Sequence, residues 1–159
     1  IAHAAGPDSF DCSQARLAGY LSALAQAGLR ADDDDLIVSS QFPYAGGRLA
    51  GARLLDLPER PTAIFAAGDE IALGILEEAR RRAIRVPEDL SIVGFDDTYL
   101  ASRSAPPLTT VAQPLKEMGR LAVRTLSQLI NGTFLGTSHL ELATHLVVRE
   151  STAPYPPRS

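Results

Sequence analysis

The chain of 159 residues has one cysteine, one methionine and no tryptophan, and its 15 Lys and Arg are outnumbered by 19 Asp and Glu. One thiol cannot form an intramolecular disulfide, so the fold must rest on a packed core, which a chain of this length can bury. The net charge of -4 argues against a surface that holds phosphate backbones through its own cations. No apolar run approaches the roughly 18 to 20 residues of a membrane span, and no basic segment followed by an apolar stretch opens the sequence.

The sequence also lacks the common patterns of enzyme and metal sites. Gly-x-Ser-x-Gly, His-Glu-x-x-His, Walker A and dinucleotide fingerprints are all missing. His3, His139 and His145 have no carboxylate or cysteine at metal-ligand spacing. We therefore expect no catalytic residue, no metal and no cofactor. One enzymatic alternative stays open, in which Cys12 or the Asp96-Asp97 pair acts as nucleophile or acid and base.

Short apolar segments alternate along the chain with segments of helical periodicity. Strands are predicted near residues 1–5, 36–38, 62–67, 90–95, 108–111 and 139–148. Helices are predicted between an N-cap at Ser13 and a stop at Gly28, and over 45–57, 69–83 and 115–130. This order predicts an α/β fold, a doubly wound parallel sheet with helices on both faces.

Polar and aromatic residues follow the predicted strands at the edge where such sheets bind ligands. Asp96-Asp97 ends one strand, Asp69 follows another, Phe42 and Tyr44 follow a third, and Arg16 lies in the first helix. Carboxylates accept hydroxyl groups, a guanidinium is a planar donor fork, and aromatic rings cover sugars or bases. The set suits a small polyhydroxylated or heterocyclic ligand. Structural alternatives exist: Asp69 as a helix N-cap, Arg16 paired with a surface acid, and Phe42 in the core.

Four ordered motifs resemble one known family. They are Pro61–Gly74, Val86–Asp97, Pro107–Val111 and Arg149–Thr152, and they resemble the C-terminal part of lactose-repressor (LacI/GalR) family transcription regulators. The resemblance covers roughly residues 1–153. It implies a periplasmic-binding-protein-like core of type I that binds a small effector, often a sugar, between two lobes, while a separate helix-turn-helix binds operator DNA.

The resemblance also assigns ligand-binding residues. Arg16 matches an arginine that hydrogen-bonds the effector, and Asp96 matches an aspartate that accepts ligand hydroxyls. Phe42 falls where some members place a stacking aromatic, and Gln113 lies at the crossover between the lobes.

One departure from the family concerns the residue before Asp69. Members commonly have an asparagine there whose amide contacts the ligand, and this chain has Gly68. Gly68 and Asp69 are still expected at the binding site. The loss of one polar contact predicts an affinity for ordinary monosaccharides that is lower by roughly tenfold.

The resemblance divides the chain into four parts. Residues 1–112 match the C-terminal lobe, 113–138 a crossover helix of the N-terminal lobe, 139–153 a return strand and 154–159 a tail. The first residue is Ile1 and the motifs begin inside the family's core, so we expect a fragment without the DNA-binding headpiece. Operator DNA is then a partner only through the missing part.

Two surfaces are expected to be covered by other protein. The apolar stripe of the crossover helix should be buried by another copy or by repacking; it comprises Leu115, Met118, Ala122 and Leu129. Homodimerisation is expected through helices 45–56 and 69–83, whose second faces hold Leu49, Arg53, Leu73 and Leu76. We predict part of a cytoplasmic transcriptional repressor that binds a sugar-like effector, with no membrane partner. The alternative is a fragment of a periplasmic sugar-binding protein of a transporter.

Overall fold

The computed structural model describes residues 1–29, 36–39, 43–132 and 139–155, and six strands of these residues form one sheet. The strand order is β2-β1-β3-β4-β5-β6. The bounds are Ala2–Ala5 for β1, Ile37–Ser39 for β2, Ala63–Ala66 for β3, Ser91–Phe95 for β4, Thr109–Ala112 for β5 and His145–Val147 for β6. The first five strands are parallel, and β6 is antiparallel to β5.

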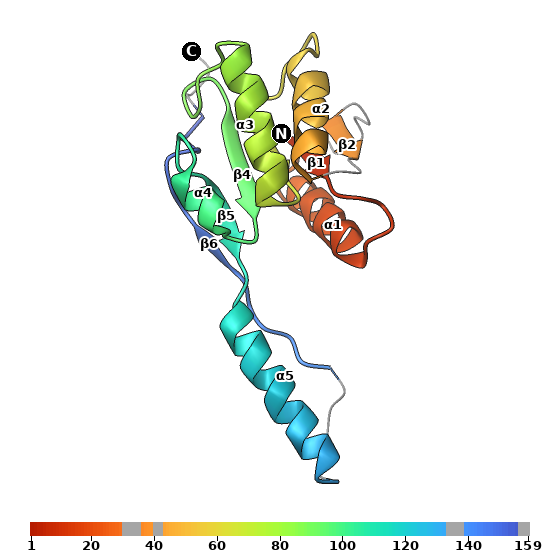
Figure 1. Cartoon of the computed structure of the whole chain (residues 1–159). Helices are drawn as coiled ribbons and strands as arrows, with labels where there is room; N and C mark the ends of the chain where they lie inside the picture. The colour runs from red at the N-terminus through yellow and green to blue at the C-terminus, as the bar shows by residue number, and fades with distance from the viewer. Residues whose placement is uncertain (30–35, 40–42, 133–138, 156–159) are drawn as a thin grey trace.

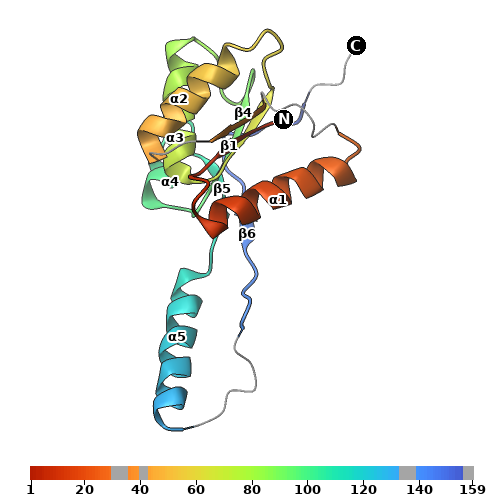
Figure 2. The same ribbon diagram turned by 90° about the vertical axis from the view of Figure 1, so that its right-hand side faces the viewer.

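Helices cover both faces of this sheet. They are α1 at Asp11–Gln26, α2 at Pro43–Leu55, α3 at Asp69–Arg81, α4 at Tyr99–Arg103 and α5 at Leu115–Ile130. Helices α2 and α3 pack side by side on one face, and α1 lies on the other (Figures 1 and 2). The predicted doubly wound α/β fold is confirmed, with the antiparallel β6 as its one exception to parallel pairing.

The main core lies between the sheet and the α2–α3 pair. Alternate residues of the central strands are completely covered, among them Ala4, Ile64 and Ile92. Ile75 and Ala79 of α3 are also completely covered and belong to the same apolar cluster. The near-continuous apolar runs of β3 and β4 follow from this arrangement, because a central parallel strand has protein on both faces.

Two glycines let α2 and α3 approach closely. A β-carbon on Gly47 would overlap the backbone carbonyl of Ile71, and one on Gly74 would overlap the carbonyl of Tyr44. Glycine weakens an isolated helix by roughly 1 kcal/mol relative to alanine. In α2 that loss is offset by the backbone-to-backbone contact with α3.

Several predicted details are wrong. Helix α1 begins at Asp11 with Phe10 at its N-cap, so Ser13 is a buried residue inside the helix. Gly68 occupies the N-cap of α3, and Asp69 is its first helical residue. Helix α4 was not predicted. The last strand is limited to His145–Val147, because only these residues pair with β5.

Helix α5 extends away from the sheet (Figure 1). None of its residues is buried, and Leu115 and Leu129 of the predicted stripe are 59% and 57% exposed. Repacking of the stripe onto the body of the same chain is therefore not observed, and burial by a second copy stays a prediction. No helix within the described residues is long and apolar enough to cross a membrane.

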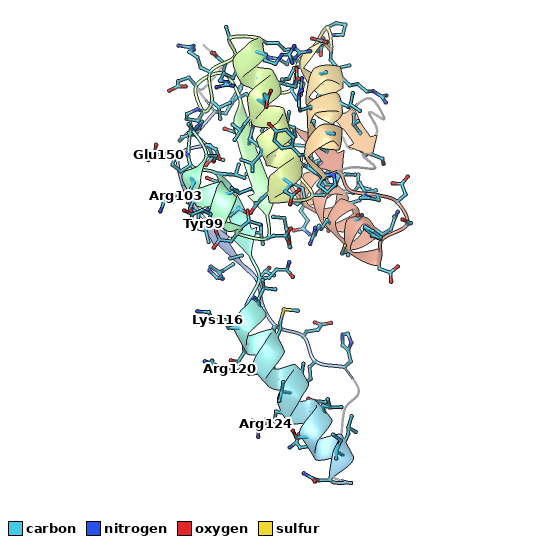
Figure 3. All side chains as sticks on the ribbon, viewed as in Figure 1. Tyr99, Arg103, Lys116, Arg120, Arg124 and Glu150 are labelled. Atoms are coloured by element: carbon cyan, nitrogen blue, oxygen red, sulfur yellow. The ribbon has the colours of Figure 1, made fainter. Side chains whose placement is uncertain are left out.

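The two sides of α5 differ in chemistry. Figure 3 shows Lys116, Arg120 and Arg124 on the side that faces away from the returning segment 139–144. On the opposite side, a hollow of about 320 Å³ separates the helix from that segment, and its lining includes Met118, Leu121 and Leu140. The helix is thus cationic on one side and apolar on the other.

Candidate ligand-binding site

Arg16 and Asp96 meet at the carboxyl edge of the sheet, where Asp96 was predicted from its place after a strand and Arg16 from its place near the start of the first helix. Arg16 extends from α1, and its Nη1 donates to the carbonyl of Ala67 just after β3. Its Nη2 lies 3.4 Å from Oδ1 of Asp96, which directly follows β4. The guanidinium carbon stands 3.9 Å from the centroid of the Phe95 ring. A cation-π contact and an ion pair together fix the orientation of this arginine.

Gln113 joins the same cluster from the end of β5. Its Nε2 donates to Oδ1 of Asp96 over 2.7 Å. Both the amide and the guanidinium contact Oδ1, and Oδ2 of Asp96 faces Gly68, where an added β-carbon would lie 3.6 Å away. Four of the predicted site residues, Arg16, Gly68, Asp96 and Gln113, are therefore neighbours.

The environment of Asp96 is unusual in charge and in backbone conformation. Burial raises the pKa of its carboxyl above the ordinary value, an effect opposed by the positive charge of Arg16 and the hydrogen bond from Gln113. Its φ angle is 109° and that of Asp97 is 50°. Non-glycine residues held at positive φ are strained, and such strain concentrates at binding and catalytic sites.

The buried side chain of Asp69 holds the strained segment of residues 96–98 in place. It is 1% exposed, and its Oδ2 accepts the backbone N–H of Thr98 over 2.6 Å. Its Oδ1 accepts the hydroxyl of Thr110 over 2.6 Å. The carboxylate of Asp69 thus links α3, β5 and the end of the loop, and both of its oxygens are used inside the fold.

The side chain of Asp97 has a different partner from that of Asp96 and pairs with Arg149. Nη2 of Arg149 lies 2.6 Å from Oδ1 of Asp97, and its Nη1 donates to the carbonyl of Leu108. Sequence reasoning placed Arg149 in a family motif without a role and did not single out Phe95. The signal for both was available, since Phe95 immediately precedes Asp96 and Arg149 is the only cation of the last motif.

The other candidates are placed elsewhere. Phe42 lies outside the described residues. Tyr44 donates to Glu77 on α3, so it belongs to the α2–α3 surface. His3 is buried and contacts the carbonyl of Phe65 through Nδ1, and Cys12 is exposed. In the described part of the chain, no three His, Cys, Asp or Glu side chains gather as metal ligands.

Two hollows adjoin the Arg16–Asp96–Gln113 cluster. One is a groove of about 640 Å³ between α1 and the sheet, and its lining includes Arg16, Gln113 and Phe95. The other, about 400 Å³, is lined by Asp96, Asp97, Gln113 and the first turns of α5. The cluster offers fixed donors and a carboxylate acceptor on an open edge, an arrangement suited to the hydroxyl groups of a small ligand.

Comparisons with known proteins identify relatives of this chain. Residues 1–152 match the family model of the periplasmic binding protein-like domain. The chain is 41% identical over 152 residues to the HTH-type transcriptional repressor CytR of Escherichia coli K12, covering 96% of this chain and 44% of that protein. It is 43% identical over 154 residues to the HTH-type transcriptional regulator DegA of Bacillus subtilis, covering 97% and 45%.

A solved structure extends the likeness to three dimensions. The complex of the transcriptional regulator CelR with cellobiose aligns with a TM-score of 0.86 at 41% identity, over 95% of this chain and 46% of that one. The chain therefore spans less than half the length of these relatives. By its family match and by these relatives, the chain belongs to the periplasmic-binding-protein-like domain family, as part of the effector-binding domain of a LacI/GalR-family regulator.

Proposed function

We propose that this chain is the effector-sensing part of a cytoplasmic transcriptional repressor and that Arg16, Asp96 and Gln113 bind a sugar-like effector. The observation that carries the proposal is that the side chains of Arg16 and Gln113 both contact Oδ1 of Asp96 at the carboxyl edge of the sheet. Two relatives support the choice of ligand and role: CytR is named a repressor, and CelR was solved with cellobiose.

The cluster is suited to binding rather than to catalysis. Asp96 is paired with Arg16 and Gln113, Asp97 with Arg149, and Asp69 with two donors inside the fold. Carboxylates held by fixed donors are suited to accept the hydroxyl groups of a ligand. We propose that the chain has no enzymatic activity and that the enzyme hypothesis for Cys12 or Asp96-Asp97 does not apply.

We propose that residues outside this chain bind the operator DNA. The chain matches 44% and 45% of the lengths of CytR and DegA, both of which are HTH-type regulators. A net charge of -4 argues against operator binding by this part of the protein. The segment of residues 113–138, which contains α5, would then complete the N-terminal lobe, with residues 1–112 forming the C-terminal lobe and 139–153 returning to it.

We propose homodimerisation through the outer surfaces of α2 and α3. Leu49 is 73% exposed on α2, and Leu73 of α3 is half-buried. Leu76, which was assigned to the same surface, is 8% exposed and packs in the core, so it is removed from the proposed interface. Leu49→Asp is expected to shift the full-length protein from dimer to monomer in sedimentation velocity.

A thermal-shift screen of sugars and nucleosides on the full-length protein tests ligand binding. An active compound should raise the unfolding temperature of the wild type, and Arg16→Ala and Asp96→Asn should each abolish the shift. Arg60→Ala and Glu88→Gln are matched controls, because both side chains are exposed and absent from the cluster. If neither Arg16→Ala nor Asp96→Asn changes the shift, the assignment of the site is wrong.

A further inference from the structure

Asp96 and Asp97 are adjacent in the chain, but their side chains are held by two different segments. Gln113, at the end of β5, donates to Oδ1 of Asp96 over 2.7 Å. Arg149, two residues after β6, pairs with Oδ1 of Asp97 over 2.6 Å. Strand β5 leads into α5, and β6 brings the chain back from it (Figure 1). The two neighbouring carboxylates are therefore tied to both segments that join α5 to the sheet.

The backbone that carries Arg149 is anchored in the sheet. Its own N–H donates to the hydroxyl of Thr109 on β5 over 2.9 Å. Two residues later, Ser151 is completely buried, and its hydroxyl accepts the backbone N–H of Thr109 over 2.8 Å. The same hydroxyl donates to the carbonyl of Ile92 on β4 over 2.6 Å. The side chain of Arg149 thus extends from a fixed point beside β4 and β5.

The guanidinium of Arg149 uses both of its terminal nitrogens. Nη1 donates to the carbonyl of Leu108, just before β5, over 2.8 Å, while Nη2 holds Asp97. The side chains of Arg149 and Asp97 are 19% and 30% exposed, so water screens the pair only in part. Because the guanidinium is a rigid planar fork, its two contacts set the direction of the Asp97 carboxylate as well as its distance.

The backbone of the two aspartates requires such a restraint. Asp96 and Asp97 have φ angles of 109° and 50°, a region that residues other than glycine rarely adopt. A backbone of this kind keeps its conformation only where the surrounding structure fixes it. Arg149 supplies that restraint at the side chain of Asp97. Once Asp97 is released, the segment can relax, and the carboxylate of Asp96 then turns away from its partners.

We infer that Arg149 is a positioning residue of the effector site: through Asp97 it sets the orientation in which Asp96 meets the ligand, and it ties that orientation to β6. The inference rests on the proposed function, which gives Asp96 its ligand. The hollow of about 400 Å³ beside the site is lined by Asp96 and Asp97 but not by Arg149. Arg149 therefore acts through Asp97 and not by touching the effector.

The titration of the Asp96 carboxyl reports its position without any ligand. Burial raises its pKa above the ordinary 3.8, so a carboxyl that turns into water should titrate closer to 3.8. Loss of the positive charge of Arg149 would by itself raise the pKa of Asp96, which is the opposite effect. The direction of the change therefore distinguishes a lost position from a lost charge.

13C NMR of the full-length protein, labelled at its aspartate carboxyls, measures this pKa. The signal of Asp96 is assigned by its absence in Asp96→Asn. In Arg149→Gln the pKa of Asp96 should fall toward the ordinary 3.8. Arg149→Lys keeps the charge but lacks the planar fork, so it should show a smaller fall. A purely structural role of Arg149 would lower the free energy of unfolding in urea and leave the titration of Asp96 unchanged.

Calorimetric titration of the same variants with cellobiose and with D-ribose measures the consequence for binding. The affinity of the sugar that binds should fall at least about fivefold in Arg149→Gln and in Asp97→Asn, and Arg149→Lys should recover part of the loss. The double variant should be no weaker than the weaker single variant, because the two side chains act as one pair.

Arg85 and Asp89 provide a matched control pair. Their Nη2–Oδ1 distance is also 2.6 Å, but they lie between α3 and β4, before the amino end of that strand and away from the site. Arg85→Gln and Asp89→Asn should leave both the titration of Asp96 and the affinity unchanged.

The two measurements separate the inference from the proposed function. A pKa of Asp96 that is unchanged or raised in both Arg149→Gln and Arg149→Lys overturns the inference, whichever sugar binds. Should Arg149→Gln fail to fold, Arg149→Lys alone decides in the same way. Unchanged affinity in Arg149→Gln, where Asp96→Asn abolishes binding, also overturns it. A fall in the pKa together with sugar binding that is unaffected by Asp96→Asn contradicts the proposed function and leaves the positioning of Asp96 by Arg149 in place.

Discussion

Gly94 of β4 lies directly against Asp69 of α3. A β-carbon at position 94 would overlap Oδ1 of Asp69 and would stand 2.8 Å from Cδ2 of Leu108. The missing side chain at Gly94 is what allows the Asp69 carboxylate to reach across the sheet to Thr110 and to the backbone of Thr98. The strained Asp96-Asp97 segment is thereby fixed by a residue that no ligand needs to touch.

Gly94→Ala should therefore destabilise the protein by about 1 to 3 kcal/mol, the usual cost of overpacking. It should also weaken effector binding, because Asp69 can no longer hold the loop that carries Asp96. Urea unfolding and ligand titration measure the two effects. Gly119→Ala is the control, since a β-carbon there meets nothing and the helix α5 should be stabilised by up to about 1 kcal/mol. Equal stabilities of the two variants would contradict the role of Gly94.

The sequence was sufficient to predict the sheet and the meeting of Arg16 with Asp96. The apolar runs of β3 and β4 indicated strands covered on both faces, and the carboxyl-edge rule then placed residues that follow strands together. Neither step needed exact distances.

The hydrogen bonds of the Asp69 carboxylate could not be predicted from the sequence pattern. Whether its carboxylate caps its own helix or crosses the sheet depends on the space above Gly94, which periodicity does not describe. The direction of β6 was equally hidden, because a period of two is the same in parallel and antiparallel strands. The exposure of Tyr44 on α2 also depended on the helix beginning at Pro43, two residues before the predicted start.

His3 predicts a pH dependence of stability. Burial lowers its pKa below the ordinary 6.5, and the nearby charge of Arg16 acts in the same direction against the hydrogen bond to Phe65. Below about pH 6.5 the unfolded chain binds a proton that the folded protein does not, so stability is complete above this pH and falls as the pH drops toward the lowered pKa.

His3→Phe keeps a ring between Tyr20 and Phe65 but cannot be protonated. Urea unfolding at about pH 7.5 and 5.5 should show a smaller loss of stability on acidification in this variant than in the wild type. His145→Gln, at an exposed position, should retain the wild-type loss. The same loss in wild type and His3→Phe would show that another group is responsible.

Asp96 predicts a pH dependence of binding. Its carboxyl must be ionised to accept two ligand hydroxyls, and burial raises its pKa above the ordinary value of 3.8, with Asp69 and Glu70 adding to the rise and Arg16 and Gln113 opposing it. Affinity should thus be complete at neutral pH and should fall, as the solution is acidified, at a pH above 3.8. Calorimetric titration as a function of pH measures the midpoint, and Asp96→Asn should remove this transition together with most of the affinity. A midpoint at or below 3.8 would contradict the environment described for this carboxyl.

Gly68→Asn adds the amide that the resemblance to LacI/GalR-family regulators leads us to expect before the aspartate of α3. The position accepts it, because φ is -166° and an added β-carbon lies 3.6 Å from Oδ2 of Asp96, an ordinary contact. Asparagine is also a favourable N-cap residue, so α3 should not lose stability. With one more polar contact to the ligand, the affinity for a monosaccharide should rise by about tenfold. Gly68→Ala, which adds the β-carbon without the amide, should leave the affinity near the wild-type value. A weaker affinity of Gly68→Asn would mean that the amide pairs with Oδ2 of Asp96 and takes the acceptor away from the ligand.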